Sequence, residues 1–121
     1  MRVQGILRRQ PSAVNRKIMT FKELIASEKP VLVDFFAEWC GPCKAFAPVL
    51  VNLKAEVGDT AQIVKIDVDK NQALSVKYDV RSIPTVMIFQ NGELKWRQTG
   101  SQTVQVLKSE IDKLLAVEND K

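Results

Sequence analysis

Histidine is absent from this chain, and cysteine occurs only twice, as Cys40 and Cys43. Without histidine the chain cannot form a Cys/His nucleophilic pair or a Cys₂His₂ zinc site of its own. The two cysteines supply only two zinc ligands, so a structural zinc would have to be shared between two chains. A disulfide between them would close a very short loop and would therefore add little to stability. Three interpretations of this pair remain open: redox chemistry, half of a metal site shared between two chains, or no function.

Long apolar runs are also missing, and the charge is unevenly distributed. No stretch approaches the roughly 18 apolar residues that a membrane span requires. Residues 1–18 hold the five basic side chains Arg2, Arg8, Arg9, Arg16 and Lys17 and no acidic one, whereas the remainder has near-equal numbers of each sign. We therefore expect a chain of one domain that binds neither membranes nor nucleic acid.

The basic segment precedes the first folding signals. We expect a disordered N-terminal extension over residues 1–18, a domain over 19–118 and a short tail over 119–121. A secretory signal is disfavoured, because Ile6-Leu7 is too short for its apolar region, whereas a mitochondrial presequence shares the arginine-rich, acid-free composition. We favour an extension upstream of a functional start at Met19. The expected location is the cytoplasm, with the mitochondrial matrix as the alternative.

From Met19 onward, apolar periodicity and turn signals predict alternating helices and strands. Thr20 and Glu23 fit a capping box, and Asn91-Gly92 indicates a hairpin. The expected elements are, in order, a helix over 21–27, a strand over 31–36, a helix over 40–57, a strand over 61–68, a short helix over 72–78, strands over 84–90 and 93–99, and a helix from 103. This order predicts an α/β domain with a mixed four- to five-stranded sheet and helices on both faces.

The two cysteines lie where the first strand leads into the second helix, in Trp39-Cys40-Gly41-Pro42-Cys43-Lys44. A thiolate at Cys40 would be stabilised by the unpaired N–H groups of the first helical turn. Pro42 is tolerated in that turn, and Gly41 allows a substrate backbone to approach closely. Cys43 lies one turn further in, so we expect it to be shielded, as suits a resolving thiol. This context favours a redox dithiol.

Two charged residues interrupt apolar strands, Asp34 in the first and Lys65 in the second. A buried carboxylate has a raised pKa, which suits it to proton transfer. The alternative for Asp34 is a strand-end aspartate in a hydrogen-bonded turn. A contact between Asp34 and Lys65 on neighbouring strands would explain both residues.

These motifs resemble the thioredoxin family, over residues 19–117. The matching segments are Val33-Asp34-Phe35, Ala37-Glu38-Trp39-Cys40-Gly41-Pro42-Cys43-Lys44, Ala47-Pro48, Asp67-Val68-Asp69 with Asn71, Tyr78-Asp79-Val80, Ile83-Pro84-Thr85 and Asn91-Gly92. The separation of Cys40 from Pro84 matches as well. The resemblance implies a thioredoxin fold.

The resemblance also implies catalytic roles. Cys40 would be the nucleophile and Cys43 the resolving thiol. Asp34 would be a buried acid and base that helps to deprotonate Cys43 through water, with Lys65 tuning it.

Substrate contacts are implied in the same way. Ile83-Pro84 would contain a cis peptide bond, and backbone atoms of Ile83 would hydrogen-bond an extended substrate. Trp39, Gly41, Pro42 and Gly100 would line a shallow apolar docking surface.

The implied function is the reduction of protein disulfides by a monomer that binds no cofactor and is recycled by a thioredoxin reductase. Gly-Pro between the cysteines resembles the reductases of the family. The rival hypotheses are a related enzyme of an oxidising compartment, a non-catalytic interaction subunit and a bridging zinc site.

Two departures from the family pattern have structural consequences. Phe36 stands where the family commonly has tryptophan, so we expect altered packing there. The segment before Thr20 is short for the family's first strand, so that edge strand should be truncated or drawn from the extension.

Overall fold

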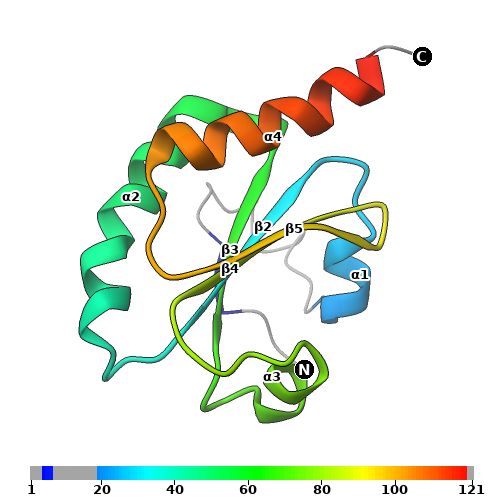
Figure 1. The fold of residues 1–121 in the computed structure, drawn as a ribbon. Helices are drawn as coiled ribbons and strands as arrows, with labels where there is room; N and C mark the ends of the chain where they lie inside the picture. The colour runs from blue at the N-terminus through cyan, green and yellow to red at the C-terminus, as the bar shows by residue number, and fades with distance from the viewer. Residues whose placement is uncertain (1–3, 7–18, 120–121) are drawn as a thin grey trace, which may run out of the picture.

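The computed structural model describes residues 4–6 and 19–119 (Figure 1). Its elements are β1 (Gln4–Ile6), α1 (Phe21–Ile25), β2 (Val31–Phe36), α2 (Gly41–Val57), the 3₁₀ turn η2 (Gly58–Thr60), β3 (Gln62–Asp67), α3 (Gln72–Lys77), β4 (Thr85–Gln90), β5 (Glu93–Thr99) and α4 (Val104–Asn119). The predicted order of elements from Met19 onward is confirmed, with boundaries that differ by a few residues. α4 extends one residue past the boundary expected at 118.

The strands form one mixed sheet in the order β1-β3-β2-β4-β5. β2 and β3 run parallel, while β4 is antiparallel to both β2 and β5. β2 is therefore the central strand. The loop that follows β2 carries the dithiol motif, so the motif starts from a strand that is paired on both sides.

The two faces of the sheet are covered by different helices, as Figure 1 shows. Val31, Val33 and Phe35 of β2 pack with α1 and α3, whereas Leu32 packs with α2 and α4. Successive strand residues point to opposite faces, so Asp34 shares the face of Leu32, beneath α2 and α4. The prediction of helices on both faces is confirmed.

Local sequence signals set the ends of α1 and α2. Thr20 and Glu23 form the expected capping box, since each side chain accepts a hydrogen bond from the backbone N–H of the other. In α2, Cys40 is the N-cap residue, and Gly58 ends the helix with a φ of 56°. Pro48 remains within the helix, which continues through it to Val57.

The expectation of a disordered extension is corrected at residues 4–6. They form β1, which pairs antiparallel with β3. The physical reason is the open edge of β3, whose N–H and C=O groups need partners. The first edge strand is thus formed by residues of the extension, which was one of the two expected outcomes; the other was a truncated strand. Residues 1–3 and 7–18 lie outside the described part of the chain, as do 120–121 of the expected tail.

Candidate active site

Cys40 and Cys43 form a disulfide at the N-terminus of α2, with their Cα atoms 5.3 Å apart. The backbone N–H of Cys43 donates a hydrogen bond to Sγ of Cys40 over 3.2 Å. Sγ of Cys40 therefore takes the place of an N-cap side-chain acceptor. A thiolate formed there on reduction would face an N–H donor and the positive end of the helix dipole.

Both cysteines are buried, with 4% of each residue exposed. Cys43 is therefore shielded, as expected, but Cys40 is shielded to the same extent, so shielding does not distinguish the two sulfurs. The position of Sγ of Cys40 as acceptor at the helix start is what separates the two sulfurs. Gly41 and Pro42 between them are exposed, and a Cβ at Gly41 would point into open space.

The loop before β4 meets the dithiol. The Ile83-Pro84 peptide bond is cis, as the resemblance implied. Ile83 packs against the two cysteines, and its carbonyl oxygen lies 3.9 Å from Sγ of Cys40. Gly100 comes to the same place, because its N–H donates to the carbonyl of Pro84 over 2.7 Å. Ile83 thus lies beside the sulfurs, and Gly100 is bonded to its neighbour Pro84.

Asp34 is fully buried, and neither carboxylate oxygen accepts a hydrogen bond from the described residues. Burial raises its pKa to about 7, against a smaller opposing effect of the positive charge on Lys65. The alternative interpretation, a strand-end aspartate in a hydrogen-bonded turn, is wrong, because Asp34 lies inside β2. A carboxyl group with this pKa can both accept and return a proton near neutral pH.

Lys65 is directly opposite Asp34 in the pairing of β2 with β3, so the two strands do bring these residues together. No hydrogen bond or ion pair joins their side chains within the described part of the chain, however. The ammonium of Lys65 lies over the ring of Phe36, 4.4 Å from its centre. Phe36 thus provides an aromatic face for this cation.

A pocket of about 380 Å³ connects this charged region with the dithiol. Its lining includes Cys43 and Lys44 of α2, together with Phe36 and Lys65. Lys65 and Cys43 therefore open onto the same space. Asp34 is next to Lys65 on the same face of the sheet but does not itself line the pocket.

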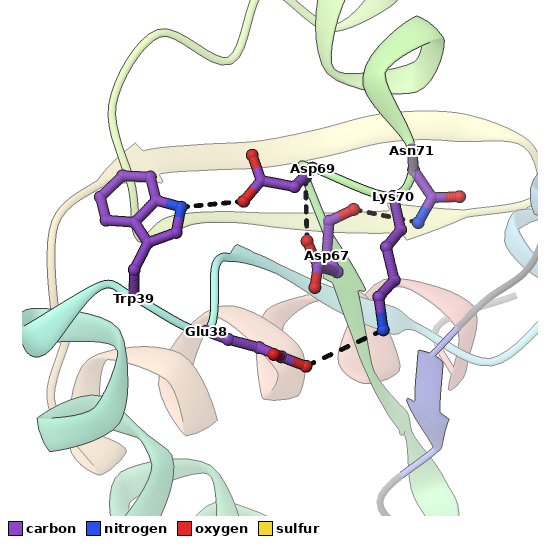
Figure 2. A network of polar contacts seen from close by, with 6 residues as sticks. All are labelled: Glu38, Trp39, Asp67, Asp69, Lys70 and Asn71. Carbon is purple, nitrogen blue, oxygen red and sulfur yellow. Dashed lines mark hydrogen bonds and ion pairs between the residues drawn. The ribbon is translucent and has the colours of Figure 1, made fainter.

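Trp39, one of the predicted docking residues, is well exposed, with 69% of its surface accessible. Its indole N–H donates to a carboxylate oxygen of Asp69 over 2.8 Å (Figure 2). Asp69 is itself held, because its backbone N–H donates to Oδ1 of the buried Asp67. The ring is therefore fixed in orientation while its apolar face stays free for a partner.

A second contact joins the same two loops, between Lys70 and Glu38 at 3.8 Å. Both side chains are well exposed, so this ion pair contributes little to stability. Buried Asn71 closes the β3–α3 loop by donating its side-chain amide to the carbonyl of Asp67. The network of Figure 2 thus ties the dithiol loop to the loop after β3.

Asp69 is a residue whose role sequence reasoning missed. It was recognised only as part of the matching segment Asp67-Val68-Asp69. The one available signal was an acidic cluster directly after an apolar strand, at the same sheet edge as the dithiol. That signal does not identify Trp39 as the hydrogen-bond partner of Asp69, because the two residues are 30 positions apart in the sequence.

The described residues contain no group of three or more His, Cys, Asp or Glu side chains placed to hold a metal ion. Within the same part of the chain, no helix combines the length and apolarity needed to cross a bilayer.

Comparison with known proteins agrees with this geometry. The sequence model of the family described as Thioredoxin matches residues 12–113. A thioredoxin of Bacillus subtilis is 48% identical over 89 residues, covering 74% of this chain and 86% of that protein. A thioredoxin of Rickettsia felis is 42% identical over 92 residues, covering 76% and 88%.

A solved structure shows the same fold. The crystal structure of oxidised mitochondrial thioredoxin 3 from Saccharomyces cerevisiae aligns with a TM-score of 0.69 at 30% identity, covering 77% of this chain and 86% of that one. The predicted thioredoxin fold is confirmed. The chain belongs to the thioredoxin family, and its Cys40–Cys43 pair is the redox centre of a dithiol–disulfide oxidoreductase.

Proposed function

We propose that this oxidoreductase works mainly as a reductant of protein disulfides, with Cys40 as nucleophile and Cys43 as resolving thiol. The observation that carries the assignment is the hydrogen bond from the Cys43 N–H to Sγ of Cys40 at the start of α2. The group that accepts this bond is the one whose thiolate the helix stabilises, and a thiolate is the attacking species.

The reaction proceeds in two exchanges. The Cys40 thiolate attacks one sulfur of the target disulfide, forms a mixed disulfide and releases the other target sulfur as a thiolate. Cys43 then loses its proton and attacks Sγ of Cys40, which releases the second target thiol. The target gains two electrons, and the chain is left with the Cys40–Cys43 disulfide that the structure contains. Asp34 is the proposed acceptor of the Cys43 proton.

We propose a thioredoxin reductase as the donor that returns two electrons to this disulfide. Family membership supports disulfide-containing proteins and such a reductase as partners in general. We also propose that the chain acts as a monomer and needs no bound cofactor.

The decisive experiment compares Cys40→Ser with Cys43→Ser in reduction of insulin disulfides. Cys40→Ser should abolish turnover, because the nucleophile is lost. Cys43→Ser should accumulate mixed disulfides with its targets, because the second exchange cannot occur. The double variant Cys40→Ser/Cys43→Ser is the control and should trap nothing. Full turnover by both single variants would exclude the reductase function, and partner binding that survives Cys40→Ser would favour the interaction-subunit hypothesis.

The cytoplasm remains the proposed location, with the mitochondrial matrix as the alternative. Fractionation of cells that express the full chain, with N-terminal sequencing of the recovered protein, tests this proposal. Recovery from the matrix with residues 1–18 removed would overturn it.

A further inference from the structure

The segment 78–84 links α3 to β4 and carries Ile83-Pro84 to the dithiol. It begins with a left-handed turn, since Asp79 has a φ of 53°. The N–H of Asp79 donates to the carbonyl of Val76, and that of Val80 donates to the carbonyl of Ser75. These two bonds form the helix-ending pattern in which glycine is the usual left-handed residue. An aspartate adopts this conformation less readily than a glycine, so hydrogen bonds from outside the turn help to hold it.

Arg97 of β5 gives that support. Its guanidinium donates one hydrogen bond to the carbonyl of Tyr78 and a second, of 2.8 Å, to the carbonyl of Asp79. Arg97 lies opposite Met87 of β4, so its side chain reaches the turn from the neighbouring strand. The planar, rigid guanidinium suits two adjacent acceptors, and its charge is favourable at the carbonyl end of α3.

The same strand also holds the other end of the segment. Gly100 directly follows β5, and its N–H donates to the carbonyl of Pro84. The segment is therefore attached to the β5 region at both ends, by the Arg97 side chain where it begins and by the Gly100 backbone where it ends. Between these attachments lies Ile83, whose carbonyl is 3.9 Å from Sγ of Cys40.

We propose that Arg97 is a positioning residue for protein substrates, which places the Ile83 backbone relative to the attacking sulfur. The proposal rests on the function proposed above, in which Ile83 pairs with an extended substrate. Without the two bonds from Arg97, the turn can shift, and the edge that receives the substrate shifts with it. A small disulfide has no extended backbone to pair, so its reduction does not depend on this placement.

The test compares Arg97→Gln and Arg97→Lys with Lys95→Gln. Lys95→Gln is the matched control, because it removes one positive charge from the same strand at a residue that pairs with Glu93. For insulin disulfides, Arg97→Gln should raise KM roughly fivefold and change kcat less than about twofold, as expected when a docking interaction is lost. Reduction of the small disulfide 5,5′-dithiobis(2-nitrobenzoate) should be unchanged. Arg97→Lys should be intermediate, because an ammonium can bond one carbonyl at a time.

Amide hydrogen exchange in the oxidised protein tests the same contact without a substrate. Exchange at Asp79 and Val80 should accelerate in Arg97→Gln and stay unchanged in Lys95→Gln. The proposal is overturned if KM for insulin does not change, if the small disulfide is affected equally, or if Lys95→Gln has the same effect. Failure of the proposed reductase function would appear separately, as no insulin reduction by the unmodified chain. In that case the exchange measurement still tests Arg97, and unchanged exchange at the amides of Asp79 and Val80 would overturn its proposed role.

Discussion

Asp34 places a carboxyl group in the middle of the sheet, where both oxygens are buried and accept no hydrogen bond from the described residues. Burial raises the pKa of this group to about 7, although the charge on Lys65 acts in the opposite direction. Lys65 does not neutralise it directly, because its ammonium lies over Phe36. At the scale of a single residue, the fold thus produces a buried carboxyl group whose pKa is raised to about 7.

Asp34→Asn should slow the attack of Cys43 on the mixed disulfide by at least about tenfold at pH 8, because a positioned base is lost. In the unmodified chain this step should accelerate as the pH rises through about 7, where Asp34 loses its proton. The variant should lack that transition. Stopped-flow measurement of the release of the reduced target, from pH 6 to 9, checks the prediction.

The first exchange is the internal control for this variant. Attack by Cys40, measured in a Cys43→Ser background, should change little with Asp34→Asn, because its thiolate is stabilised at the start of α2. Equal rates of the second step with and without Asp34 would contradict the proposed proton transfer.

At the scale of an element, α1 shows how a short helix depends on its cap. It has only five residues, too few to be stable alone, and its first turn is closed by the reciprocal bonds of Thr20 and Glu23. Its buried residues Phe21, Leu24 and Ile25 then cover the face of the sheet formed by Val31, Val33 and Phe35.

Thr20→Ala should lower the free energy of unfolding by about 1 kcal/mol, because the N–H of Glu23 loses its side-chain acceptor. Urea unfolding followed by circular dichroism measures this change. Lys22→Ala, at an exposed position of the same helix, is the control and should have little effect. A Thr20→Ala variant as stable as the unmodified chain would show that packing alone holds α1 in place.

At the scale of the whole molecule, Asp34 couples stability to pH. Its pKa is about 7 in the folded protein and 3.8 as the ordinary value, so the folded state binds more protons between these values. Stability therefore falls as the pH rises through this window and levels off above it. The full effect is about 4 kcal/mol, at roughly 1.4 kcal/mol for each pH unit.

The free energy of unfolding from pH 5 to 8, compared between the unmodified chain and Asp34→Asn, tests this coupling. Relative to the variant, the unmodified chain should lose about 1.4 kcal/mol per pH unit up to about pH 7. Asp59→Asn, which changes an exposed carboxylate, should keep the slope of the unmodified chain. Parallel curves for Asp34→Asn and the unmodified chain would contradict an elevated pKa.

The sequence by itself determined the elements from Met19 onward, because each is set by neighbours in the chain. Apolar periodicity, the capping box at Thr20 and the Asn91-Gly92 turn act over a few residues. The motif Trp39–Lys44 likewise placed the cysteines at the start of α2. The position of Asp34 inside an apolar strand marked it as a candidate, but its role toward Cys43 and the place of Ile83-Pro84 beside the dithiol came only from resemblance to a family.

Only the tertiary structure decided how distant segments meet. β1 pairs with β3 because the edge of β3 offers unpaired backbone groups. No signal in the sequence of residues 4–6 predicts this pairing. The anchoring of Trp39 by Asp69 and the support of the Tyr78–Asp79 turn by Arg97 depend on contacts between separate loops and strands. The ammonium of Lys65 also lies over Phe36, and Asp34 has no hydrogen-bond partner within residues 4–6 and 19–119. Burial and aromatic contact, rather than sequence spacing, fix where that charge lies.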